Sequence, residues 1–144
     1  MSAAFTNTAG TVTFADTGSF GTTGKWRDGS EGGQKIDGPE YGYDFPAIAG
    51  VSGTGTVAYG YRGQKISMSV IYVNTSMNAV LAAVQADLVI LGSYPSTLVL
   101  DGQTYLACTL DAGASGMAGY VKSTGAGKYW VQVKIAVTAH RKVA

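Results

Sequence analysis

Residues 64–106 read QKISMSVIYVNTSMNAVLAAVQADLVILGSYPSTLVLDGQTYL, and they indicate the fold class. The first ten of them, 64–73, alternate between apolar and polar side chains. One face of this run holds Ile66, Met68, Val70 and Tyr72. A period of two is typical of a strand with one buried face, so a strand is predicted here.

A helix is expected directly after this strand, over about residues 76–90. Asn74-Thr75-Ser76 can cap its first turn, because their side-chain oxygens accept hydrogen bonds from unpaired backbone amides. Apolar residues follow this cap at helical spacing, which predicts a buried stripe of Met77, Val80, Leu81, Val84 and Leu88. Gly92 and Pro95 are expected to end the helix.

The remaining strands are predicted from turn signals and alternation. Asp101-Gly102 lies between two β-rich runs and predicts a two-residue hairpin turn. The last strand, 128–140, carries an apolar face, while Trp130 lies on its polar face. A short strand near 119–123 precedes it, and further strands are expected at 11–14 and 54–61. The predicted fold is mainly β: an antiparallel sandwich or barrel with one packed α-helix and a Gly-rich N-terminal extension.

The chain has 144 residues, which suits one domain. Its composition changes near residue 64. Positions 1–64 hold 14 of the 21 glycines and a net charge of −2, while positions 65–144 carry +3. We therefore expect residues 1–63 to form a Gly-rich extension with a long loop, belonging to the same domain as a β-sandwich core over 64–144.

Charged and aromatic residues concentrate within the extension. Eight of the ten charges in positions 1–64 fall between Lys25 and Asp44. A long loop of this kind is typically disordered or ordered by a partner. Trp26 is expected to be hard to bury locally, and Trp130 either fills a second layer or anchors a partner. The candidate subunit-interface residues are Trp26, Tyr41, Tyr43, Phe45 and Trp130.

No catalytic constellation is visible, so we expect no enzyme activity, cofactor or metal. The single histidine, His140, ends a strand, and the single cysteine, Cys108, lies in an apolar run typical of a buried thiol. Gly125-Ala126-Gly127-Lys128 fails the phosphate-loop pattern and indicates a turn. The acidic residues match no calcium loop, and a solvated or intersubunit loop is the preferred interpretation for Asp28, Glu31, Asp37, Glu40 and Asp44.

Two partner classes are also disfavoured. No apolar run reaches the roughly 18 residues that a membrane-spanning helix needs. A charge of +3 in the C-terminal part is too mild for a dedicated nucleic-acid binder, so no sequence recognition of nucleic acid is expected.

A family resemblance rests on four segments of the core. They are Lys65-Ile66-Ser67-Met68-Ser69-Val70, Val80-Leu81-Ala82-Ala83-Val84, the hairpin Thr97 to Tyr105, and Tyr129-Trp130-Val131-Gln132-Val133-Lys134-Ile135. In this order, residues 64–140 resemble the β-sandwich core of phage tail-tip proteins, notably the distal tail and related baseplate proteins of long-tailed phages. The first 64 residues match nothing in that family, and no appended carbohydrate-binding domain is expected after the core.

The resemblance implies a structural virion protein with a tail-tube-like core. It implies a homo-oligomeric ring, expected to be a hexamer, that contacts neighbouring tail proteins. Such a protein is made in the host cytoplasm and located in the virion tail. Three alternatives stay open: a capsid decoration protein, a carbohydrate-binding β-sandwich and a small-ligand barrel.

Overall fold

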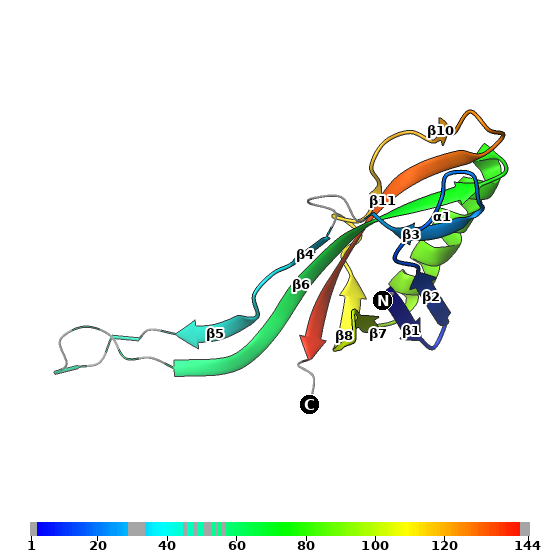
Figure 1. Ribbon diagram of the computed structural model, residues 1–144. Helices are drawn as coiled ribbons and strands as arrows, with labels where there is room; N and C mark the ends of the chain where they lie inside the picture. The colour runs from blue at the N-terminus through cyan, green and yellow to red at the C-terminus, as the bar shows by residue number, and fades with distance from the viewer. Residues whose placement is uncertain are drawn as a thin grey trace.

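The alternating run at 64–73 belongs to the longest strand of the computed structural model, β6, which spans Val57–Asn74 (Figure 1). The structure describes residues 3–28, 34–44, 46–47, 49–50, 53, 55 and 57–141. Strands make up 54% of the chain, and the antiparallel sheet is nearly closed into a barrel. The predicted fold class, mainly β with one packed helix, is therefore confirmed.

The described residues form one helix and eleven strands. Besides β6, the elements are β1 (Ala3–Asn7), β2 (Gly10–Phe14), β3 (Gly24–Arg27), β4 (Gln34–Ile36), β5 (Glu40–Asp44), α1 (Met77–Ser93), β7 (Ser96–Leu100), β8 (Gln103–Leu110), β9 (Gly116–Met117), β10 (Lys122–Ser123) and β11 (Tyr129–Arg141).

The main sheet runs β2-β1-β7-β8-β11-β6-β3, with antiparallel pairing between neighbours. Its two ends then meet. Ala15, directly after β2, forms a parallel bridge with Trp26 of β3, and the Arg27 amide donates to the Ala15 carbonyl at 2.7 Å. The backbone groups that an open sheet would expose at these two edges are partly paired within the chain.

The inward faces of the strands form the core. The alternation predicted for 64–73 is confirmed, because Ile66, Met68, Val70 and Tyr72 are all buried. The first strands supply two rings, Phe5 and Phe14. Phe14 meets Phe5 and Tyr72 edge to face, with ring centroids 6.4 and 6.0 Å apart. Residues before position 64 are therefore part of the same core as those after it.

The helix begins where the sequence predicts. Ser76 is its N-cap and accepts a hydrogen bond from the Ala79 amide at 3.1 Å. The predicted stripe is partly wrong, because Met77 and Leu81 are exposed. The buried row consists of Val80, Val84, Asp87 and Leu91, so the helix is rotated relative to the expected stripe and continues past residue 90 to Ser93.

The predicted hairpin turn is also present. Asp101 and Gly102 both have positive φ, 51° and 82°, as a type I′ turn between β7 and β8 requires. An irregularity in the same pairing was not predicted. Ser96 lies opposite Cys108 and Leu98 opposite Tyr105, and Ala107 has a φ of 52°, which indicates a β-bulge.

Candidate assembly surface

One part of the chain projects from the body as a two-stranded arm (Figure 1). We define the arm as β5 with its partner, the first part of β6 over residues 57–63. β6 pairs with β11 only from Gln64 onwards. At Gly63 the backbone has a φ of +140°, and a Cβ there would lie 3.3 Å from the Ala139 carbonyl. Glycine therefore allows β6 to leave the body at this point.

The arm exposes aromatic rings to solvent. Tyr41 and Tyr43 are 43% and 54% exposed. The Tyr41 ring meets Tyr61 edge to face at 6.0 Å, and the Tyr61 hydroxyl donates to the Ala139 carbonyl at 3.2 Å. Burial raises the pKa of Tyr61 above its ordinary value. The base of the arm is thus attached to β11, whereas the side chains of Tyr41 and Tyr43 are exposed to solvent.

The arm also has backbone edges that the described residues leave unpaired. In the body, β6 lies between β11 and the short strands β3 and β4. Among the residues that the structure describes, the 57–63 part of β6 pairs with β5 alone, and β5 pairs only with β6. Unpaired strand edges are able to accept a further strand from another chain.

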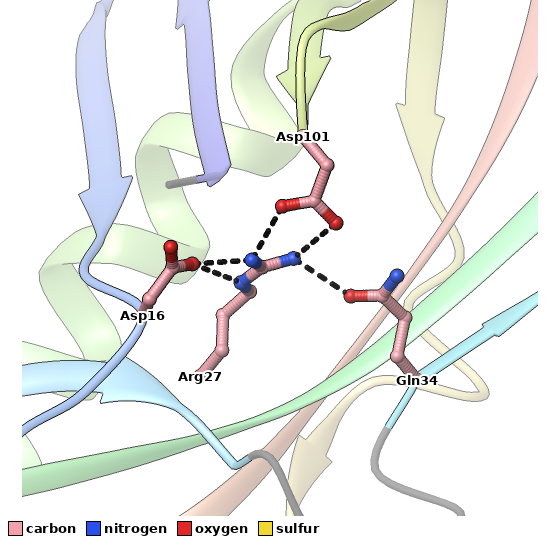
Figure 2. Close-up of polar contacts among 4 residues, drawn as sticks. All are labelled: Asp16, Arg27, Gln34 and Asp101. Atoms are coloured by element: carbon pink, nitrogen blue, oxygen red, sulfur yellow. Dashed lines mark hydrogen bonds and ion pairs between the residues drawn. The ribbon is translucent and has the colours of Figure 1, made fainter. Parts of the chain in front are cut away.

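A charged cluster attaches the segment before the arm to the body (Figure 2). The Arg27 guanidinium donates to both oxygens of Asp101, at 2.6 and 3.1 Å, and to Gln34 at 2.9 Å. It also donates to Asp16. The hydrogen bonds from Arg27 hold the pKa of the Asp101 carboxyl below its usual value. Arg27 therefore connects β3 to the β7–β8 turn and to β4, the strand that leads into the arm.

A second hydrophobic cluster covers the outer face of the sheet. Trp26, Ile71 and Val73 are buried there, and Trp130 packs against them. Phe20 meets the Trp26 ring at 5.5 Å and the Trp130 ring at 5.0 Å. The expectation that Trp26 would be hard to bury locally is wrong, since only 7% of it is exposed. Two alternatives were open for Trp130: filling a second layer of the fold, or anchoring a partner. Its packing in this cluster matches the first of them.

The structure separates the predicted interface residues into two groups. Tyr41 and Tyr43 lie on the arm, while Trp26 and Trp130 lie in the outer cluster. Phe45 lies outside the described residues. The sequence analysis missed Phe20, which caps both tryptophans, and Tyr61, which supports Tyr41. Tyr61 could have been found from its place in the predicted strand at 54–61, but no local pattern marks Phe20.

A buried polar contact joins α1 to the sheet. The Asp87 carboxylate, from the buried row of the helix, accepts hydrogen bonds from Lys25 Nζ and the Tyr72 hydroxyl, both at 2.7 Å. Burial, followed by the contact with Asp87, raises the pKa of Tyr72 far above its ordinary value. Lys25 Nζ also lies 5.6 Å from the centre of the Phe14 ring. These contacts explain how a helix row can bury an aspartate.

The other reactive side chains have structural surroundings. Burial raises the pKa of the Cys108 thiol to about 11, so the expected buried thiol is confirmed. His140 is exposed and its Nε2 lies 2.8 Å from Thr109 Oγ1. No group of three histidine, cysteine or acidic side chains suited to a metal ion occurs in the part of the chain described.

A shallow groove on the outer face gathers basic and acidic side chains together. Lys35, Lys65 and Lys134 line it with Asp37 and Asp111. The two carboxylates offset most of the positive charge, so this groove is not a strongly basic patch.

Among the described residues, no helix has both the length and the apolar character needed to cross a membrane.

The comparisons with known proteins give no family for this chain. Its sequence matches no protein-family model and no curated protein.

Proposed function

We propose that this chain is a structural virion protein of a bacteriophage tail that assembles as a homo-oligomeric ring at the tail tip, the baseplate or the tube junction. The observation that carries the proposal is the arm. Its strands leave the body, expose Tyr41 and Tyr43, and have outer edges that pair with no further strand among the described residues.

The contrast between the arm and the body supports an assembly role. The body pairs Ala15 with Trp26 and so brings the two ends of its sheet together. An isolated two-stranded hairpin is marginally stable in water. The arm is therefore the part of the chain whose stability would increase most if a second copy covered it. Aromatic side chains are the usual anchors of such contacts.

Two further features agree with a ring. The opposite net charges of positions 1–64 and 65–144, −2 and +3, favour head-to-tail contacts between copies. Head-to-tail contacts generate closed rings when the rotation between copies closes. The resemblance of residues 64–140 to phage tail-tip cores gives the ring its proposed place in a virion.

The first experiment measures the mass of the full chain by light scattering after gel filtration and images it by negative-stain electron microscopy. We expect rings, with six copies as the proposed number. A monomer at every concentration tested would overturn the proposal. A monomer that instead bound glycans through its exposed tyrosines would favour the carbohydrate-binding alternative, and one that bound preformed shells would favour a capsid decoration protein.

The second experiment tests the arm with a matched control. The double variant Tyr41→Ser/Tyr43→Ser should lose the ring and remain folded as a monomer, because both side chains are exposed and lie outside the buried core. Tyr120→Ser removes an even more exposed tyrosine, 88% exposed, from the body and should keep the ring. A double variant that still forms rings would exclude the arm as the assembly contact.

A further inference from the structure

A pocket lies at the end of β11, between the two strands that flank it. The pairing of β11 with β6 stops at Ala139 and Gln64, and its pairing with β8 stops at Arg141 and Leu106. Both neighbours continue, β6 toward the arm and β8 toward the β7–β8 turn. Figure 1 shows the end of β11 beside the start of β8, with β6 diverging from them. The mouths of β-barrels are frequent places for small-molecule sites.

This pocket combines tyrosine rings and neutral polar groups with one positive charge. Its volume is about 260 Å³, and its lining includes Tyr61 and Gln64 from β6, Gln103, Thr104 and Tyr105 from β8, and Arg141 from β11. No acidic side chain is among the described residues that line it. Within the same part of the chain, Arg141 forms no ion pair. The positive charge of the pocket is therefore not offset by its own lining.

Several of the lining side chains are already held in position. The Tyr61 hydroxyl donates to the Ala139 carbonyl at 3.2 Å, and Gln64 Nε2 donates to the Asp37 carbonyl at 2.9 Å. Tyr105 is half-buried and packs against the main core. Side chains that are fixed before a ligand arrives lose little conformational entropy on binding. The pocket is thus largely formed in the free chain.

The functional groups of the lining indicate the class of ligand. A guanidinium such as that of Arg141 binds carboxylates through two parallel hydrogen bonds. The Gln103 amide and the Thr104 hydroxyl each donate and accept, which suits the hydroxyls of a sugar. The rings of Tyr61 and Tyr105 provide apolar surface for the C–H groups of a sugar ring. A purely apolar ligand would instead desolvate these polar groups without pairing them.

We propose that this pocket binds a sugar acid, a single sugar ring that carries a carboxylate. Arg141 holds the carboxylate, Gln103 and Thr104 bind ring hydroxyls, and the tyrosines contact the ring. The volume lies near the lower end of the range of ligand pockets, about 300–1,000 Å³, and so suits one ring rather than a longer chain of sugars. This binding activity goes beyond the proposed ring assembly and does not depend on it.

The first test compares two sugars that differ only in the carboxylate. The full chain, labelled with ¹⁵N, is titrated with methyl glucuronide and separately with methyl glucoside, and amide shifts are followed by NMR. We expect the glucuronide to shift the amides of residues 103–105 and Arg141, and the neutral glucoside to bind about tenfold more weakly or less. Equal binding of the two sugars, or shifts confined to other residues, would overturn the proposal.

Two variants and a matched control then test the assigned groups. Arg141→Gln should weaken glucuronide binding about tenfold, and Thr104→Val about fivefold. Arg141 is exposed, so its variant should keep its melting temperature. Arg62→Gln replaces another exposed arginine, on β6 and outside the lining, and should leave binding unchanged. Unchanged binding in Arg141→Gln would show that this arginine does not hold the carboxylate.

A competition experiment separates a sugar-acid site from a general anion site. Inorganic phosphate added at the same concentration as the glucuronide should not displace it, because phosphate cannot use the tyrosine rings. Full displacement by phosphate would overturn the sugar-acid assignment. A chain that forms rings without binding the glucuronide contradicts only this inference, and a monomeric chain that binds it through Arg141 contradicts only the proposed ring.

Discussion

Replacing Lys25 with methionine should destabilise the protein far more than its partly exposed position suggests. Lys25 is one of the two groups that hydrogen-bond the Asp87 carboxylate, and the Asp87 side chain is only 11% exposed. Methionine keeps much of the length of the lysine side chain and removes its charge. The Lys25→Met variant therefore leaves a buried carboxylate with the Tyr72 hydroxyl as its remaining partner among these contacts.

The expected cost follows from burial. Removing one partner of a fully buried ion pair costs about 3–5 kcal/mol, because the other charge stays buried and uncompensated. The Lys25 side chain is 30% exposed, so water can partly replace the ammonium and lower that cost. We expect a loss of about 2–3 kcal/mol in the free energy of unfolding, between the fully buried case and that of an ordinary lost hydrogen bond. For a chain of this size, that lowers the melting temperature by roughly 4–12 °C.

Urea denaturation followed by tryptophan fluorescence measures this loss, because Trp26 follows Lys25 directly in β3. The double variant Lys25→Met/Asp87→Leu should recover part of the lost stability, since it removes both charges together. Tyr72→Phe should cost less, about 1–2 kcal/mol, because it removes only a hydroxyl donor. A Lys25→Met variant as stable as the unmodified chain, with no recovery in the double variant, would refute the reasoning.

Three further predictions use other contacts. Gly18→Ala should cost about 1–3 kcal/mol in thermal unfolding, because a Cβ there overlaps the Trp26 indole, whereas Gly21→Ala, with only Ser19 Oγ at 3.7 Å, should be nearly neutral. Arg27 lowers the pKa of Asp101 below its ordinary 3.8, so the stability from this pair is present above about pH 4 and is lost as the pH falls through the lowered pKa. The variant Asp101→Asn should flatten this part of the curve of unfolding free energy against pH. Asparagine is chosen because it tolerates the positive φ at this position. Cys108 should not react with a thiol reagent at pH 8 until urea unfolds the chain, and a fast reaction in the native state would contradict its burial and raised pKa.

The features that the sequence predicted correctly are local. The Asp101-Gly102 turn, the alternation at 64–73 and the Ser76 cap each depend on residues a few positions apart. Their backbone preferences act within a single element. The rotation of α1 was missed because the polar residue of its buried row, Asp87, is satisfied by Lys25, which lies 62 positions away in the chain.

The features that the sequence did not predict depend on distant partners. Trp26 was expected to be hard to bury locally beside glycines, yet Trp130 and Ile71 cover it from two other strands. Barrel closure through Ala15 and Trp26 leaves no periodic signal either, since it is a single bridge. The pairing of β5 with the first part of β6 as a projecting hairpin was not predicted for a related reason: alternation indicates a strand but not whether that strand lies on the body or projects from it.

The way the body is closed limits where assembly contacts can form. Its sheet is nearly continuous around the core, and the outer tryptophans are largely covered by Phe20 and their own strands. Tyr41 and Tyr43 of the arm are exposed, as are Met77, Leu81 and Val89 of α1, and Figure 1 shows the arm and α1 at opposite ends of the molecule. Head-to-tail contacts that repeat from copy to copy generate closed rings, and this is the arrangement expected for the proposed assembly.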